Sequence, residues 1–198
     1  MRARSLSLAA LAAFAVTTLV PARASGQLPR VRVSTSLGDI VIAVDTVHAP
    51  VTSANFLSYV DAGMYANGRF HRTVTPQNQP DNLVKIEVIQ GGRDSAHAGE
   101  RAPIPLERTS VTKLKHLDGT VSMARGGPDT ATSDFFICIG DQPELNYGGK
   151  RNPDGQGFAA FGRVVRGMDV VRKIHGAPAK GQALVPVIPI VGASRVSR

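Results

Sequence analysis

The sequence predicts a mainly β domain, an antiparallel barrel or sandwich, in which two helices accompany many short strands. Short runs of alternating or continuous apolar residues recur through the chain and are separated by clusters of Gly, Pro, Asn and Asp. Only two segments space their apolar residues as a helix does. A parallel α/β sheet needs a helix after nearly every strand, so this pattern argues against that class.

The first two strands are predicted to form a hairpin. Residues 31–36 alternate apolar and polar side chains, and residues 40–44 are an apolar run. The intervening Leu37-Gly38-Asp39 supplies a tight turn between them.

The clearer helix is predicted to begin at Pro50, because proline at the first helical position sacrifices no hydrogen bond. Val51, Ala54 and Leu57 repeat at helical spacing, and Gly63 suits the end of the helix. A second, shorter helix is predicted over Met168–His175.

Six further strands complete the predicted sheet. They cover residues 69–74, 84–90, 120–124, 134–139, 158–165 and 183–196. Gln90 continues the apolar face of its strand, which indicates a pocket wall. Pro186 and Pro189 favour a sheet edge or a bulge for the last strand.

The first 24 residues have the features of a cleaved signal peptide. Arg2 and Arg4 precede an apolar run over residues 6–20, and Ala22-Arg23-Ala24 matches the small-x-small pattern of a cleavage site. The apolar run is short for a membrane-spanning helix. We therefore expect a mature domain over residues 25–198 that is periplasmic or secreted and has no membrane span after cleavage.

Charge and cysteine content narrow the class of protein. The whole chain carries a formal charge of +8; without the three arginines of the signal segment, 20 basic and 15 acidic residues remain. The basic residues are not clustered, so nucleic-acid binding is not predicted. Cys138 is the single cysteine, which excludes an internal disulfide, and its apolar neighbours indicate a core residue rather than a nucleophile.

Several sequence motifs of nucleotide-binding proteins, metal-binding proteins and hydrolases are incomplete or stand in the wrong structural context. Residues 155–160 match a dinucleotide fingerprint, but a predicted strand follows instead of the helix that would bind a pyrophosphate. Gly149-Lys150 lacks the other residues of a P-loop, and the five histidines have no metal-ligand spacing. The nucleophile elbow of serine hydrolases is missing from the sequence. We predict neither a metal nor a cofactor.

Six short segments, in order along the chain, resemble the cyclophilin-type peptidyl-prolyl cis-trans isomerases. They are Thr52-Ser53-Ala54-Asn55-Phe56, Phe70-His71-Arg72, Gln90-Gly91-Gly92, Ser122-Met123-Ala124, Phe135-Phe136-Ile137 and Phe161-Gly162-Arg163-Val164. The resemblance extends over residues 31–196. It implies a closed eight-stranded antiparallel β-barrel capped by two α-helices, and an enzyme that isomerises X–Pro bonds during the folding of exported proteins.

The resemblance also implies which residues form the site. Arg72 corresponds to the catalytic arginine, Gln90 to its hydrogen-bonding neighbour, and Phe136 to the floor of a proline pocket. The residues expected to bind substrate are Phe70, Val88, Ala124, Arg125, Asp134, Phe135, Phe136, Leu145 and Phe158. The expected partners are proline-containing polypeptides, and the expected state is a monomer.

Four features depart from the family pattern. The link between Arg72 and Gln90 is longer than usual, and Asp134 stands where glutamine is usual. Glu144 lies near the position of a tryptophan found in some members, and Glu87 replaces a usual aromatic residue. These departures leave an alternative function open, a chaperone of the same fold that holds proline-containing segments with little turnover.

Overall fold

The computed structural model describes residues 27–94 and 99–196. The predicted signal peptide, residues 1–24, and its cleavage site lie outside the described residues. In the described parts of the chain, no helix is long and apolar enough to cross a membrane.

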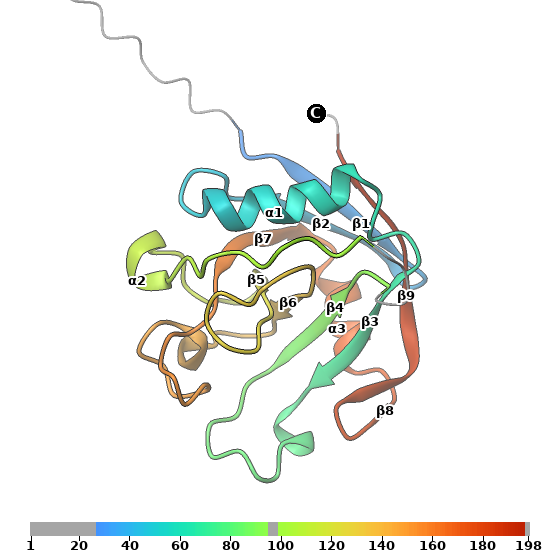
Figure 1. The fold of residues 1–198 in the computed structure, drawn as a ribbon. Coiled ribbons are helices and arrows are strands. Elements are labelled where there is room, and N and C mark those ends of the chain that lie inside the picture. The colour runs from blue at the N-terminus through green and yellow to red at the C-terminus, as the bar shows by residue number, and fades with distance from the viewer. Residues whose placement is uncertain (1–26, 95–98, 197–198) are drawn as a thin grey trace, which may run out of the picture.

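Eight antiparallel strands close into a barrel (Figure 1). They run in the order β1-β2-β7-β5-β6-β4-β3-β9, and β9 pairs back onto β1. Their bounds are β1 Arg30–Thr35, β2 Gly38–Val44, β3 Gly68–Val74, β4 Val88–Gly92, β5 Thr120–Met123, β6 Phe135–Cys138, β7 Ala160–Arg166 and β9 Ala183–Arg195. A two-residue strand, β8 (Ala179–Lys180), pairs antiparallel with the start of β9 and forms a short ribbon with it. The barrel is thus confirmed over the sandwich.

Two helices cap the barrel, as predicted. α1 (Pro50–Asp61) lies across one end and α3 (Met168–His175) packs against β2, β3 and β4 (Figure 1). Phe56 of α1 and Ile174 of α3 are fully buried in the same core, which fills the barrel interior. A third helix, the single turn α2 (Thr109–Thr112), lies outside the helices and strands that the sequence predicts.

The strand predicted over residues 84–90 is wrong in its first half, because β4 begins only at Val88. Side chains form hydrogen bonds with backbone groups that would otherwise pair with a neighbouring strand. Ile86 exchanges hydrogen bonds with the buried amide of Gln79, and the carbonyl of Val84 accepts one from Arg151 at 2.7 Å. These bonds satisfy the backbone outside the sheet, so the segment stays ordered without being a strand.

The last strand follows one of the two alternatives that its prolines allowed. β9 pairs with both β3 and β1, so it is not an edge strand. Its register with β3 shifts between the pairs Phe70–Ile188 and Arg72–Ala183, which places Pro186 in a bulge.

Candidate active site

A β-bulge in β3 turns Arg72 to the outer face of the barrel. Residues two apart on a regular strand point to the same side, so Phe70 and Arg72 should share a face. In the pairing with β4, however, Phe70 lies opposite Gly91 and Arg72 opposite Gln90, which leaves His71 as the extra residue. Phe70 therefore enters the barrel core, whereas Arg72 faces outward.

The bulge places Arg72 in line with polar and aromatic residues of three neighbouring strands. Arg72 is opposite Gln90, Gln90 is opposite Phe136, and Phe136 is opposite Ser122. Residues directly opposite each other in a sheet point to the same face, so these four side chains form one row across β3, β4, β6 and β5. The row joins the proposed catalytic pair to the proposed pocket floor.

Arg72 is held from two sides by neutral amides. Its Nη1 donates to Oε1 of Gln90 at 2.9 Å, and its Nε and Nη2 donate to Oε1 of Gln182 at 2.9 and 2.6 Å. A guanidinium has five N–H donors, so the bonds to described residues leave one donor on each terminal nitrogen for a ligand. Burial, and then the nearby charge of Arg151, lowers the pKa of Arg72 from its ordinary value, yet an arginine stays charged near neutral pH.

A cavity of about 240 Å³ lies beside Arg72 on this outer face. Its lining residues are Arg72, Ile86, Val88, Gln90, Ala124, Arg125, Phe136, Leu145, Arg151, Asn152 and Phe158. Phe136, Val88 and Leu145 belong to a small apolar cluster that is separate from the barrel core. The pocket combines apolar surface with several polar and charged side chains, a combination that can bind a ring and polarise a group beside it.

Phe158 forms one wall of the pocket and is fixed by Arg125. The rings of Phe158 and Phe136 meet edge to face with centroids 5.2 Å apart, and the Arg125 guanidinium lies 5.0 Å from the Phe158 centroid. Arg125 also pairs with Asp154 at 2.7 Å and donates to the carbonyl of Gly157 at 2.6 Å. Its side chain is only 1% exposed, so it supports the wall from behind.

His116 supports the pocket floor and had no place in the sequence-based site. Its ring stacks on Phe136 with centroids 5.9 Å apart and planes 14° from parallel. Nε2 lies 3.0 Å from the Ser122 hydroxyl, and Nδ1 lies 2.9 Å from Oδ1 of Asn146. Burial lowers the pKa of His116 to about 4, against a smaller opposite effect of the Asn146 hydrogen bond. The ring is therefore neutral at neutral pH.

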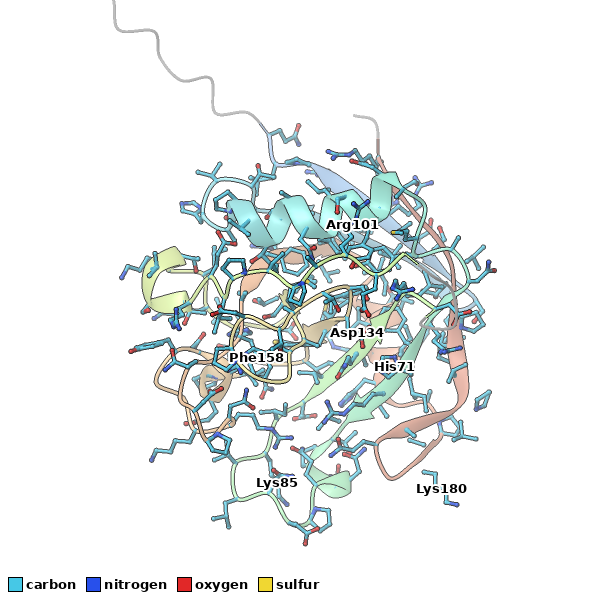
Figure 2. All side chains as sticks on the ribbon, in the orientation of Figure 1. His71, Lys85, Arg101, Asp134, Phe158 and Lys180 are labelled. Carbon is cyan, nitrogen blue, oxygen red and sulfur yellow. The ribbon has the colours of Figure 1, made fainter. Side chains whose placement is uncertain are left out.

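Asp134 reaches Arg72 through Gln90 and not directly. The Gln90 amide donates to Oδ2 of Asp134 at 3.2 Å, while its oxygen accepts from Arg72. Figure 2 shows Asp134 beside His71, whose Nε2 is 3.6 Å from the carboxylate. The carboxylate also lies so close to Gly92 that a β carbon there would overlap Oδ1. Asp134 thus sets the direction of the Gln90 amide.

The structure does not bring three of the expected substrate-binding residues, Asp134, Phe70 and Phe135, to the lining of the pocket. Phe70 and Phe135 are fully buried inside the barrel, where their rings meet edge to face at 5.8 Å. Phe70 is turned inward by the bulge at His71, and Phe135 is turned inward by the ordinary alternation that turns Phe136 outward. Their role is to pack the core behind the site.

Sequence reasoning missed Gln182 and Arg151 as neighbours of Arg72. Gln182 follows β8 and meets Arg72 only because β9 closes the barrel against β3. Arg151 lies in a Gly-, Asn- and Pro-rich loop, and its contacts with Gln79 and Val84 span about 70 residues of sequence. Such contacts leave no local sequence signal, since each depends on how distant segments pack.

The two glutamates that depart from the family pattern face other partners. Glu87 points toward α3, where its carboxylate lies 3.8 Å from Nε2 of His175. Glu144 accepts a hydrogen bond from the backbone N–H of Lys150 at 2.8 Å and shapes the loop that carries Arg151. Neither side chain lines the 240 Å³ cavity.

Known proteins resemble this chain in both sequence and fold. The family model described as "Cyclophilin type peptidyl-prolyl cis-trans isomerase/CLD" matches residues 30–195. A peptidyl-prolyl cis-trans isomerase of Streptomyces antibioticus is 36% identical over 166 residues, which cover 81% of this chain and 93% of the relative. Peptidyl-prolyl cis-trans isomerase B of Escherichia coli is 38% identical over 144 residues, 72% of this chain and 81% of the relative.

Solved structures agree with these sequence matches. A cyclophilin-type peptidyl-prolyl cis-trans isomerase of Cryptosporidium parvum, crystallised in the presence of the dipeptide Ala-Pro, superposes with a TM-score of 0.68 and 25% identity. The superposition covers 85% of this chain and 99% of that chain.

Proposed function

Because this chain belongs to the cyclophilin-type peptidyl-prolyl cis-trans isomerases, we propose that its outer-face pocket accelerates rotation about X–Pro bonds in exported polypeptides. Family membership supports the isomerase activity itself. What we propose in addition is the role of each residue and the class of exported substrates. The observation that carries it is the Arg72 guanidinium, held by Gln90 and Gln182 beside the Phe136 floor.

The reaction needs no bond to be made or broken. Rotation about the X–Pro bond must break amide resonance against a barrier of about 20 kcal/mol, and without a catalyst it takes tens of seconds. As the amide twists, the lone pair of the prolyl nitrogen localises and becomes a hydrogen-bond acceptor. An enzyme that binds the twisted amide more tightly than either planar form therefore accelerates both directions.

Arg72 is suited to recognise that twisted amide. One N–H on each of Nη1 and Nη2 is free of the protein hydrogen bonds that hold the guanidinium. Partial burial strengthens a hydrogen bond from either donor to the prolyl nitrogen. The two glutamines fix the guanidinium before substrate arrives, so little reorganisation is needed during rotation.

The apolar residues of the pocket hold the proline ring while the rest of the peptide turns. Phe136, Val88 and Leu145 are nearly fully buried and present carbon surface, and Phe158 closes one side. The Ala-Pro dipeptide used with the Cryptosporidium parvum relative supports this assignment for a proline-containing ligand.

Export is proposed from the first 24 residues, whose basic start, apolar run and Ala22-Arg23-Ala24 pattern are typical of a cleaved signal peptide. The substrates are then other exported chains, which must fold outside the cytoplasm. Intact mass of the protein recovered from outside the cytoplasm tests this, and we expect a chain that starts near Ser25. A chain that still starts at Met1 would contradict export with cleavage.

A protease-coupled isomerisation assay on an Ala-Pro peptide tests the catalytic proposal. We expect the wild-type domain to accelerate isomerisation and Arg72→Ala to lose most of that acceleration. If the wild-type domain binds the peptide without accelerating it, the protein is the proline-segment chaperone of the alternative reading. If Arg72→Ala retains full activity, the assignment of Arg72 is wrong.

A further inference from the structure

We propose that Arg151 makes this pocket select X–Pro segments that carry a carboxylate next to the proline. The inference rests on the proposed function of the pocket and names the class of substrate that it prefers. It starts from a second guanidinium in the cavity, since Arg72 and Arg151 both line it.

Neither of these arginines is neutralised by a carboxylate within residues 27–94 and 99–196. Arg72 bonds to two glutamine oxygens, and Arg151 bonds to Oε1 of Gln79 and to the carbonyl of Val84. Among the described residues, no carboxylate oxygen lies within 4.0 Å of either guanidinium. The third arginine of the cavity, Arg125, differs because it pairs with Asp154.

In the part of the chain that the structure describes, the Nε–Nη2 edge of Arg151 makes no hydrogen bond. Both described side-chain bonds come from Nη1, at 2.8 Å to Gln79 and 2.7 Å to Val84. The Nε and Nη2 donors are the pair that binds a carboxylate through two parallel hydrogen bonds. Gln79 is itself 1% exposed and bonded to the backbone of Thr75 and Ile86, so Arg151 is anchored to a buried part of the long link between β3 and β4.

The electrostatics favour an anionic ligand over a neutral one. Burial lowers the pKa of Arg151, and burial together with the charge of Arg151 lowers the pKa of Arg72. Two partly desolvated positive charges beside one cavity destabilise each other when it is empty. A carboxylate bound there relieves that repulsion, whereas an amide of the same shape does not, so Glu and Gln form a matched pair of probes.

The test compares Glu with Gln in otherwise identical peptides. One series places the residue before proline and the other places it after proline, and NMR exchange spectroscopy measures isomerisation without a coupling protease. In the wild-type domain we expect kcat/KM for Glu to exceed that for Gln about fivefold in at least one series, the size of a partly exposed ion pair. In Arg151→Gln we expect the ratio to fall to about one.

Two more variants make the test specific. Lys150→Gln removes the same charge from the neighbouring position of the loop, outside the cavity, and should leave the ratio at its wild-type value. Arg151→Lys keeps the charge but loses the fork, so we expect a ratio of about two. If Arg151→Gln does not fold, the Glu-to-Gln ratio of Arg151→Lys is compared with that of the wild type instead.

The outcomes separate this inference from the proposed function. A wild-type ratio of about one in both series, a ratio that survives in Arg151→Gln and Arg151→Lys, or an equal loss in Lys150→Gln would overturn acidic selection while leaving the isomerase intact. Failure of the wild-type domain to accelerate any of the peptides would instead overturn the proposed function of the pocket.

Discussion

Oε1 of Gln182 accepts two hydrogen bonds from Arg72, at 2.9 Å from Nε and 2.6 Å from Nη2, across 110 residues of sequence. Closure of the barrel produces this contact, because β9 returns beside β3 just after the turn that carries Gln182. The orientation of the proposed catalytic group therefore depends on the last strand of the fold as well as on its own strand.

Replacing Gln182 by leucine should lower kcat about tenfold with a smaller change in KM. The variant removes the bonds that orient the guanidinium, and hydrogen bonds to charged groups are worth about 1.5–3 kcal/mol. Lys180→Ala is the matched control, since Lys180 ends β8 two residues before Gln182, is exposed and points away from the site (Figure 2). If kcat of Gln182→Leu equals that of the wild type, Gln182 is only a surface contact.

Replacing Asp134 by alanine should lower kcat/KM about threefold to fivefold. A carboxylate accepts but does not donate, so Asp134 holds the NH₂ end of Gln90 and leaves the Gln90 oxygen for Arg72. Asp134→Asn retains a carbonyl acceptor and should restore most of the activity. An unchanged kcat/KM in Asp134→Ala would remove Asp134 from the mechanism.

Gln79 should stabilise the insertion between β3 and β4 by about 1–3 kcal/mol, the cost of leaving buried polar groups unpaired. Its side chain is buried and makes three hydrogen bonds to the backbone of Thr75 and Ile86. Denaturant unfolding of Gln79→Ala measures the loss, with the exposed neighbour in Gln77→Ala as control. Equal stability of the two variants would show that the insertion is held by other contacts.

The domain should lose stability as the pH falls from 6.5 toward 4, because of His116. Burial lowers the pKa of His116 from 6.5 in the unfolded chain to about 4 in the fold. The unfolded state therefore binds a proton in this window before the native state does, and stability falls with pH. This pKa difference between the two states corresponds to about 3 kcal/mol of folding free energy. That stability is fully present above pH 6.5 and is lost progressively as the pH falls toward 4.

Unfolding free energies measured from pH 7 to 4.5 in the wild type and in His116→Gln test this assignment. The variant cannot titrate at this position, so its stability should change less over the window. A wild-type stability that does not fall between pH 7 and 5, or the same slope in the variant, would contradict the role of His116.

The elements that the sequence predicts well are those whose signal is local. The hairpin of β1 and β2, the start of α1 at Pro50 and the bounds of α3 all follow from periodicity and turn residues within a few positions. The position of Gln90 at a pocket wall follows from strand alternation in the same way.

The features that escape prediction depend on packing between distant segments. The bulge at His71 breaks the rule that residues two apart share a face, so Phe70 lies in the core although Arg72 lies in the pocket. Gln79 and Arg151 replace a strand partner for Ile86 and Val84, which no alternation pattern reveals. Gln182 reaches the site only through barrel closure.

The most direct test of the central claim is kcat/KM for an Ala-Pro peptide in Arg72→Lys, with Arg172→Lys on the exposed face of α3 as control. Lysine keeps the positive charge but cannot be held by two glutamines while donating from a planar fork to the prolyl nitrogen. We expect kcat/KM of Arg72→Lys to fall about a hundredfold, as when a single transition-state donor is removed, and the control to match the wild type. A value for Arg72→Lys within threefold of the wild type would show that the oriented guanidinium does not stabilise the twisted amide.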